Sequence, residues 1–207
     1  MTSPTPGLPR HAARARSALR AIAVCLVASG MVLCAQAQDL TLDAILGLFA
    51  NRQHGHVLYS EEVESALLEH PLHTSGELFF DAPDRLEKRT LKPTPQQLIA
   101  EGEQLTVIRG RHRASMRLRD YPQLSPLLDG LRATLAGDRA SLEKNFRLSL
   151  AASGSSWTLD LQPLASDAKP VYQRIEIRGQ EGEIHEVVLE RSNGERTIMT
   201  LSAPAES

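Results

Sequence analysis

Short segments in which apolar and polar residues alternate fill the sequence between residues 57 and 118 and constrain its fold most strongly. A period of two residues is that of a β-strand with one buried and one exposed face. Most connections between these segments hold few residues, as in Ala82-Pro83-Asp84 and Glu101-Gly102-Glu103. A parallel pair of strands needs a crossover of about a dozen residues or more, so the spacing predicts hairpins in an antiparallel sheet.

Alternating segments with turn signals between them continue after residue 145, and the whole chain is expected to form eleven strands. Asn193-Gly194, which is typical of a two-residue hairpin turn, separates the last two. A sheet of this size is large enough to curl. The expected strands cover residues 57–63, 76–81, 85–91, 97–100, 105–109, 111–119, 146–152, 157–161, 171–178, 184–191 and 197–201.

Two segments have helical periodicity instead. Residues 39–53 place apolar side chains at helical spacing, and residues 124–135 carry a stripe of leucines that ends before Gly137. Asp138 is placed to cap a further short helical turn through Lys144. The fold class is therefore mainly β, of the α+β type, with the helices packed on the sheet. Periodicity leaves open whether these helices cover an ordinary core or form a movable lid over a lipid-sized cavity.

The first 37 residues are typical of a secretory signal peptide. A basic region from Arg10 to Arg20 precedes the apolar residues 21–28, and Ala35-Gln36-Ala37 is a small-x-small cleavage site. A signal anchor is the alternative, but the apolar run is too short to span a bilayer comfortably. We therefore expect export, cleavage near Ala37, and one domain covering residues 38–207.

Composition narrows the possible functions of that domain. Residues 1–37 hold four arginines and no acid, so the 23 Lys+Arg fall to 19 against 25 Asp+Glu, a net charge of −6. An acidic exported domain is not expected to bind nucleic acid. Both cysteines, Cys25 and Cys34, precede the domain, which excludes a disulfide scaffold and a cysteine nucleophile. Aromatic residues make up 4% of the chain and hydrophobic residues 42%, so the core is expected to be aliphatic.

Candidate catalytic residues are few. His54-Gly55-His56 could offer two imidazoles to a metal, with His70 and His73 as later ligands. A zinc site needs at least three ligands in a fixed geometry. The favoured alternative is that these histidines are solvated and lie in loops. The acidic segment 61–64 has no partner acid for glycoside hydrolysis and is expected at an exposed strand end. Nucleotide-binding glycine loops and a nucleophile elbow are missing from the sequence. These patterns favour a protein that is not an enzyme and needs no cofactor or metal, with a metal-assisted hydrolase that uses His54 and His56 as a minor alternative.

Arginine occupies every second position from Arg109 to Arg119, except for Ser115. On a strand these side chains would lie on one face. That face could be solvent-exposed and paired with Glu87 or Glu176 on neighbouring strands. It could instead bind an anionic partner or a lipid headgroup, for which arginine is well suited.

Several loose motifs occur along the chain in the order seen in one known family. Residues 75–86 match the pattern Ser-Gly-x-Leu-x-Phe-x-x-Pro-x-Arg-Leu, residues 101–107 match a Gly-x-x-Leu-x-Val hairpin, and residues 157–163 match Trp-x-Leu-x-Leu-x-Pro. With these motifs the chain resembles the LolA-like periplasmic carriers of outer-membrane lipoproteins, over nearly all of residues 39–202. It departs from them at Ala82, where the carriers have an arginine thought to latch the lid, and at Leu86-Glu87-Lys88, where they have aromatic residues.

The resemblance implies an unclosed half-barrel of about eleven antiparallel strands, covered by the N-terminal and central helices, with an apolar cavity for acyl chains. It implies a non-enzymatic carrier in the periplasm of the Gram-negative envelope, expected to be a monomer. Such a carrier takes an acylated lipoprotein or another acyl lipid from an inner-membrane donor and passes it to an outer-membrane acceptor. The alternative is a periplasmic adaptor that binds protein partners and carries no lipid. We expect the cavity residues to be Leu78, Phe80, Leu86, Met116, Leu118, Leu148, Trp157 and Leu159, and the lid residues to be Leu46, Phe49, Leu128 and Leu131.

Overall fold

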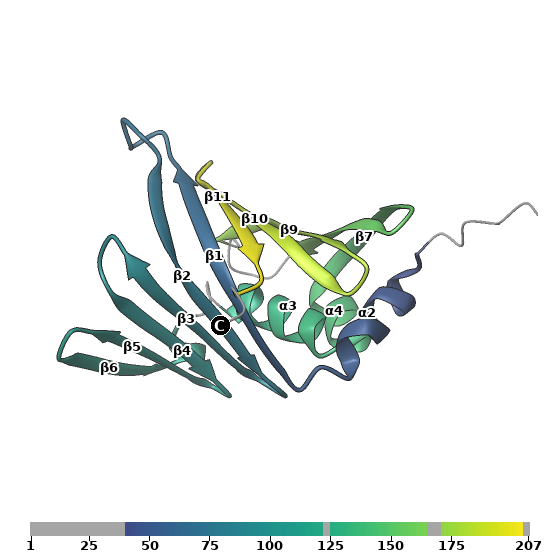
Figure 1. Ribbon diagram of the computed structural model, residues 1–207, viewed down its shortest axis with the longest axis horizontal. Coiled ribbons are helices and arrows are strands. Elements are labelled where there is room, and N and C mark those ends of the chain that lie inside the picture. Colours follow the sequence, from purple (N-terminus) through teal and green to yellow (C-terminus); the bar gives the residue numbers. More distant parts are fainter. Residues whose placement is uncertain (1–39, 122–124, 165–170, 205–207) are drawn as a thin grey trace, which may run out of the picture. The chain divides into compact units, whose positions relative to one another are not determined.

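The computed structural model describes residues 40–121, 125–164 and 171–204, which form an antiparallel β-sheet with helices packed on it (Figure 1). The expected signal peptide, residues 1–37, lies outside the described residues. The strands are β1 His54–Glu64, β2 Leu72–Asp81, β3 Arg85–Lys92, β4 Gln96–Glu101, β5 Gln104–Arg109, β6 His112–Arg117, β7 Phe146–Ser153, β8 Ser156–Pro163, β9 Tyr172–Gln180, β10 Glu183–Arg191 and β11 Arg196–Ser202.

Two meanders build this sheet. Strands β1 to β6 lie side by side in chain order, and so do β7 to β11, because the connections within each meander are too short for crossovers. The pairing of β1 with β11, which places Tyr59 opposite Leu201, joins the two meanders. Strands β6 and β7 lie at opposite ends of the sheet, so it does not close. The expected unclosed antiparallel sheet of eleven strands is confirmed.

The described helices are α2 Leu42–Ala50, α3 Ser125–Leu135 and α4 Arg139–Asn145. Thr41 caps α2 by accepting a hydrogen bond from the Ala44 amide at 3.2 Å, because a side-chain oxygen satisfies an amide that has no partner within the helix. Asp138 caps α4 in the same way through the Ser141 amide at 3.0 Å, as the sequence predicts. None of the helices in the described part of the chain is long and apolar enough to cross a membrane.

Among the predicted boundaries that the structure corrects, two show what decides where an element ends. The first helix ends at Ala50 and not at residue 53, and β1 begins at His54 and not at residue 57, because residues 54–56 pair with residues 79–81 of β2. The sixth strand ends at Arg117, because its partner β5 begins opposite that residue, and a short 3-10 turn, Leu118–Asp120, follows. In both places pairing with a neighbouring strand, and not local periodicity, decides where the element ends.

The face of the sheet that carries the helices, called here the inner face, is apolar in both meanders. Its residues occupy alternate strand positions, so that side chains from successive strands meet in rows across the sheet. One row in the second meander contains Leu150, Leu159, Ile177, Val187 and Met199. One row in the first meander contains Phe80, Leu86, Ala100, Leu105 and Met116.

Two apolar clusters form on the inner face. The larger one packs the apolar side of α2 against β8, β9 and β10, and its members include Ile45, Leu46, Phe49, Trp157, Leu159, Ile175 and Ile177. The smaller one joins Ala100, Leu105 and Leu118 to Leu128 of α3. Because α3 also contributes Ala133 to the larger cluster, this helix bridges the two meanders.

Trp157 holds α2 on the sheet. Its ring meets Phe49 edge to face, with the ring centroids 6.0 Å apart, and its indole N–H donates to the Glu181 carbonyl at 2.9 Å. Gly179 lies directly opposite on β9, and a Cβ atom there would come within 2.3 Å of the indole ring. The indole ring therefore fits at this position only because residue 179 has no side chain.

Replacing this glycine tests the packing. Gly179→Ala should lower the free energy of unfolding by about 1–3 kcal/mol, the usual cost of forcing extra atoms into a packed core. The new methyl group would meet the Trp157 ring at 2.3 Å and the Glu183 carbonyl oxygen at 2.4 Å. Urea denaturation measures the change. Gly55→Ala on β1 is the matched control, since its Cβ meets nothing closer than 3.7 Å, and equal stability of the two variants would contradict the contact.

Candidate functional site

A cavity of about 500 Å³ lies between α3 and the inner face of the sheet. The helix lines it with Leu127, Leu128, Leu131, Thr134 and Leu135. Both meanders contribute apolar side chains to its floor, among them Val57, Leu78, Phe80, Leu98, Met199 and Leu201. Its size and its mostly apolar lining are typical of sites for small apolar ligands.

The cavity exists because the two apolar clusters fill only the two ends of the inner face. Val57, Leu78, Leu98, Met199 and Leu201 line the cavity and are only half-buried, although the last three also contact one of the clusters. Removing apolar surface from water contributes about 25 cal/mol per Å². These side chains therefore lack part of that stabilisation, and an apolar ligand that fills the space would supply it.

Five of the residues expected at a ligand site line this cavity. Leu78, Phe80 and Leu86 do so from the sheet, and Leu128 and Leu131 from α3. All five carry aliphatic or aromatic side chains that point to the same space from the two layers. Their role in binding a ligand stays a prediction.

The other expected site residues lie elsewhere. Phe49 of α2 packs on Trp157 of β8, so this helix covers a filled core, and neither Leu46 nor Phe49 lines the cavity. Leu118 turns into the smaller cluster because the strand ends one residue before it. The larger cluster holds or contacts Leu46, Phe49, Leu148, Trp157 and Leu159, and the smaller holds or contacts Met116 and Leu118.

Sequence reasoning missed the cavity residues of the middle strands, such as Val57, Leu98 and Met199. Alternation along each strand could have found Val57, which pairs with Leu78 and therefore shares its face. To place Met199 beside the first meander, one must know the register between β1 and β11, two strands at opposite ends of the domain sequence. Nothing local in the sequence encodes that register.

One ion pair interrupts the apolar floor of the cavity. Lys88 of β3 lies opposite Leu78 and pairs with Glu61 of β1. Thr74 donates a hydrogen bond to the other carboxylate oxygen of Glu61 at 3.1 Å, and the Lys88 ammonium lies 4.8 Å from the ring centroid of Tyr59. Glu61 is 8% exposed, so the expectation of an exposed acidic strand end is wrong at this residue.

Tyr59 adds a neutral hydrogen-bonding group beside that pair. Its hydroxyl shares a hydrogen bond of 2.7 Å with the Thr90 hydroxyl. Burial raises the pKa of the Tyr59 phenol above its ordinary value, and hydrogen bonds to Thr90 and Thr74 oppose this only in part. The phenol is therefore uncharged at neutral pH and leaves the charge balance of the Glu61–Lys88 pair unchanged.

Arg191 of β10 is a second cation that lines the cavity. It pairs with Glu195 at 2.8 Å, and its guanidinium donates to the Tyr172 hydroxyl at 3.3 Å. An uncompensated charge would be costly in such an apolar space. The cations that line the cavity all have carboxylate partners there: Lys88 has Glu61, Arg191 has Glu195 and Arg52 has Glu183. This balance suits an uncharged apolar ligand.

Glu87 and Glu176, which the sequence analysis expected to pair with the arginines of residues 109–119, have other partners. Burial raises the pKa of Glu87, but hydrogen bonds from Gln97, Arg89 and Arg85 outweigh it and hold this pKa below its ordinary value. Glu176 pairs with Arg174 and Arg178. The expected pairing is wrong because β6, at the edge of the sheet, has β5 as its neighbour, whereas the two acids lie on β3 and β9.

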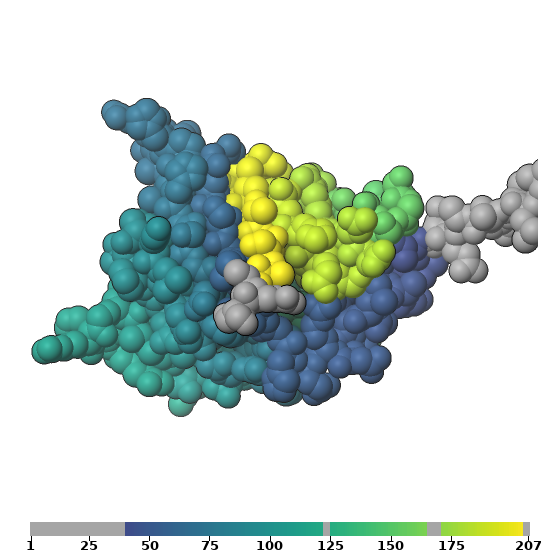
Figure 2. Space-filling model, viewed as in Figure 1, coloured from purple at the N-terminus to yellow at the C-terminus, as the bar shows by residue number. Residues whose placement is uncertain are grey.

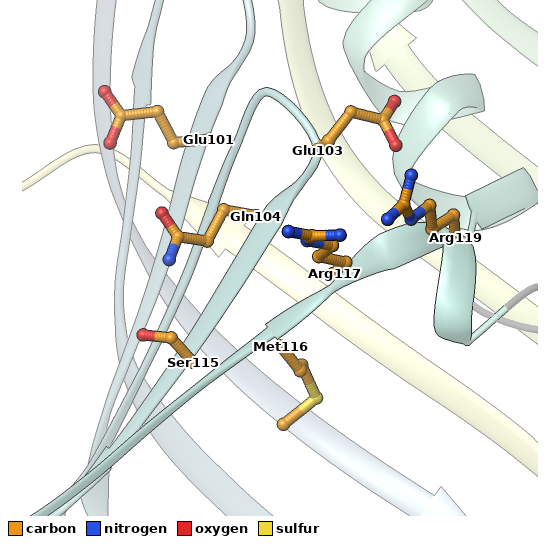
Figure 3. A pocket seen from close by; sticks show the side chains of 7 residues that line it. All are labelled: Glu101, Glu103, Gln104, Ser115, Met116, Arg117 and Arg119. Atoms are coloured by element: carbon orange, nitrogen blue, oxygen red, sulfur yellow. The ribbon is translucent and has the colours of Figure 1, made fainter.

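A second hollow, of about 510 Å³, lies beside the edge strand β6 (Figure 3). It is lined by Glu101, Glu103, Gln104, Ser115, Met116, Arg117 and Arg119. In Figure 3 Arg117 and Arg119 lie next to each other near Glu103. Apart from Met116 this lining is polar and carries both signs of charge, so the cavity under α3 is the better candidate for an apolar ligand.

Two of the histidines weighed as metal ligands each contact a carboxylate on the neighbouring strand β2. His54 contacts Asp81 at 2.9 Å, and His56 contacts Glu77 at 3.5 Å while it stacks on Phe79. His73 lies on β2, not in the loop where it was expected. Within residues 40–121, 125–164 and 171–204, no three His, Cys, Asp or Glu side chains are grouped so that they could hold a metal ion.

Residues 34–206 match the family model described as outer membrane lipoprotein carrier protein LolA-like. This range includes every strand and helix described above. The chain belongs to the LolA-like family. The resemblance found in the sequence motifs is thereby confirmed. No curated protein matches this LolA-like chain.

Solved structures are similar to this LolA-like protein at low sequence identity. A LolA superfamily protein from Nitrosomonas europaea is 13% identical, with a TM-score of 0.45, over 81% of this chain and 96% of that one. A DUF1329 family protein from Desulfovibrio piger is 10% identical, with a TM-score of 0.44, over 78% and 88%. A chain in the MucA/MucB complex of Pseudomonas aeruginosa is 14% identical, with a TM-score of 0.39, over 80% and 59%.

The ion pair in the cavity floor can be tested through stability. Lys88→Met leaves Glu61 buried without its cation and should lower the free energy of unfolding by about 2–4 kcal/mol. The double variant Lys88→Met with Glu61→Gln removes both charges and should regain most of that loss. Urea denaturation compares them, with the exposed Lys92→Met as control. A double variant that is as unstable as Lys88→Met alone would show that the pair does not matter.

Proposed function

We propose that this LolA-like protein is a periplasmic carrier that holds an acyl chain of a lipoprotein or a related lipid and moves it toward the outer membrane. The observation that carries the proposal is the apolar cavity of about 500 Å³ under α3, which the protein's own side chains leave open. Membership of the LolA-like family supports a carrier function. The expected signal peptide supports export. Binding by burial alone suffices for such a carrier, so the proposal includes no catalytic step.

The cavity volume limits the size of the bound group. A methylene group is about as large as a water molecule, whose share of the liquid is ~30 Å³. On this scale the cavity accommodates roughly fifteen methylene-sized groups, which corresponds to one alkyl chain of a membrane lipid. Each methylene that leaves water contributes about 0.8 kcal/mol, so affinity should rise with chain length until the cavity is filled.

Helix α3 is the element whose movement would open the cavity. It is attached to the first meander through Leu128 in the smaller cluster and through Arg132, which donates to the Gly102 carbonyl at 3.0 Å. In contrast, α2 is fixed to the second meander by Phe49 and Trp157. Release of a ligand would therefore need a shift of one helix while the sheet and α2 stay in place.

Filling the cavity tests the proposal. Leu78→Trp puts a larger side chain into the open space, so it should lower the affinity for a monoacylglycerol with a fluorescent acyl chain at least tenfold, with little effect on folding. Fluorescence titration of the purified protein measures the affinity. Leu58→Trp is the matched control, because Leu58 lies on the neighbouring strand with the opposite parity and does not line the cavity.

Equal affinities of the two tryptophan variants, or a wild-type protein that does not bind the probe, would contradict an acyl-chain site in this cavity. Mass spectrometry of lipids extracted from the purified protein adds an independent result. Copurified lipid supports the carrier. An empty cavity that also excludes the probe would favour the protein-binding adaptor instead.

A further inference from the structure

The arginines at the tip of the β5–β6 hairpin have no carboxylate partners, unlike most other arginines of the sheet. Elsewhere in the sheet ion pairs are formed by Arg85, Arg89, Arg174, Arg178, Arg191 and Arg196. Within the described residues Arg111 and Arg113 form none, and Arg109 donates to the neutral side chain of Gln96 at 2.9 Å. This hairpin thus ends in a group of uncompensated cations.

This group, residues 109–113, is called here the arginine tip. It comprises Arg109, the turn at Gly110 and Arg111, and the start of β6 at His112 and Arg113. All five residues are exposed, and β6 is an edge strand with β5 as its neighbour. In Figures 1 and 2 the tip lies at the far left, where the hairpin extends from the rest of the sheet.

Carboxylates lie at the other end of the hairpin. Glu101 and Glu103 line the hollow beside Arg117 and Arg119, and Asp120 lies 4.0 Å from Arg119. The segment 104–119 itself contains no Asp or Glu. Positive charge is therefore concentrated at the tip and compensated at the base of the same hairpin.

We propose that the arginine tip docks this protein on a bilayer surface that carries anionic phospholipid headgroups. Arginine presents several donors in a planar fork that matches phosphate oxygens. A basic residue near an anionic bilayer raises the affinity about fivefold. The whole domain cannot supply this attraction, because residues 38–207 carry 19 basic against 25 acidic residues. The tip must therefore approach the membrane while the acidic remainder of the domain stays away from it.

The surroundings of the tip favour a membrane over an acidic protein. A protein interface needs an apolar centre with anchoring side chains. The large exposed apolar side chains of the described residues, which are Leu48, Leu67, Leu68, Leu72, Leu91 and Leu164, all lie outside the β5–β6 hairpin. Arg109 and His112 form one cross-strand pair and Arg113 the next, so the side chains of Arg109 and Arg113 point to opposite faces of the hairpin. Cations spread over both faces suit a layer of headgroups.

Vesicle sedimentation tests the proposal without any ligand in the cavity. The probe is vesicles of equimolar phosphatidylglycerol and phosphatidylcholine, with pure phosphatidylcholine as the uncharged comparison. The triple variant Arg109→Gln, Arg111→Gln and Arg113→Gln should lose at least tenfold in affinity for the anionic vesicles. The control Lys92→Gln, Lys144→Gln and Arg147→Gln removes the same charge from exposed residues elsewhere and should stay within about twofold of wild type. All variants keep residues 1–37, so any contribution of that basic segment is common to them.

Equal losses in the two triple variants would show that only net charge matters and would overturn the proposal. Absence of binding to the anionic vesicles would overturn it too, as would equal binding to both kinds of vesicle. A photocrosslinker at position 111 that captures a protein while the vesicles are not bound would assign the tip to a protein partner. Leu78→Trp should bind the vesicles like wild type, so failure of this proposal and failure of the carrier proposal are distinguishable.

Discussion

The antiparallel pairing of β1 with β11 is the interaction on which the site depends, because it joins two meanders into one inner face. Strands lie about 4.8 Å apart, so eleven of them span roughly 50 Å when flat. Helix α3 has 11 residues and is about 16 Å long at 1.5 Å per residue. Short helices of this kind cannot cover such a face. Two packed clusters form where the helices contact the sheet, and the space between the clusters stays open.

The charged residues are arranged differently in the cavity and at the arginine tip. In the cavity each cation has a carboxylate partner, as Lys88 has Glu61, because an isolated charge in an apolar space is expensive. At the arginine tip the cations are exposed and uncompensated, and their attraction acts over roughly a Debye length of about 10 Å. In the functions proposed above, the uncharged interior would hold an acyl chain and the charged tip would dock the protein on a membrane.

Strand and helix positions were largely predictable, since alternation and helical spacing are local patterns. Prediction failed where a distant element decided the outcome. Trp157 has the right parity for a cavity wall, but α2 packs on it through Phe49, and the residue became part of the core. Glu61 was expected to be exposed, but it is buried, because the ion pair with Lys88 from another strand compensates its charge. Leu78 was predicted at the cavity and lines it, because no helix lies over that part of the sheet closely enough to fill it.

By itself the sequence determined the eleven alternating segments, the apolar stripes of the helices, the cap at Asp138, and the order of motifs that places the chain in the LolA-like family. These features depend on residues a few positions apart, whose geometry a strand or a helix fixes. The tertiary structure alone decided the register of β1 against β11, the site at which each helix lands, and therefore which apolar side chains pack and which face an open cavity. Those outcomes depend on contacts between residues far apart in the chain. Burial stabilises an apolar side chain against any apolar partner, so the type of residue does not specify which partner it contacts.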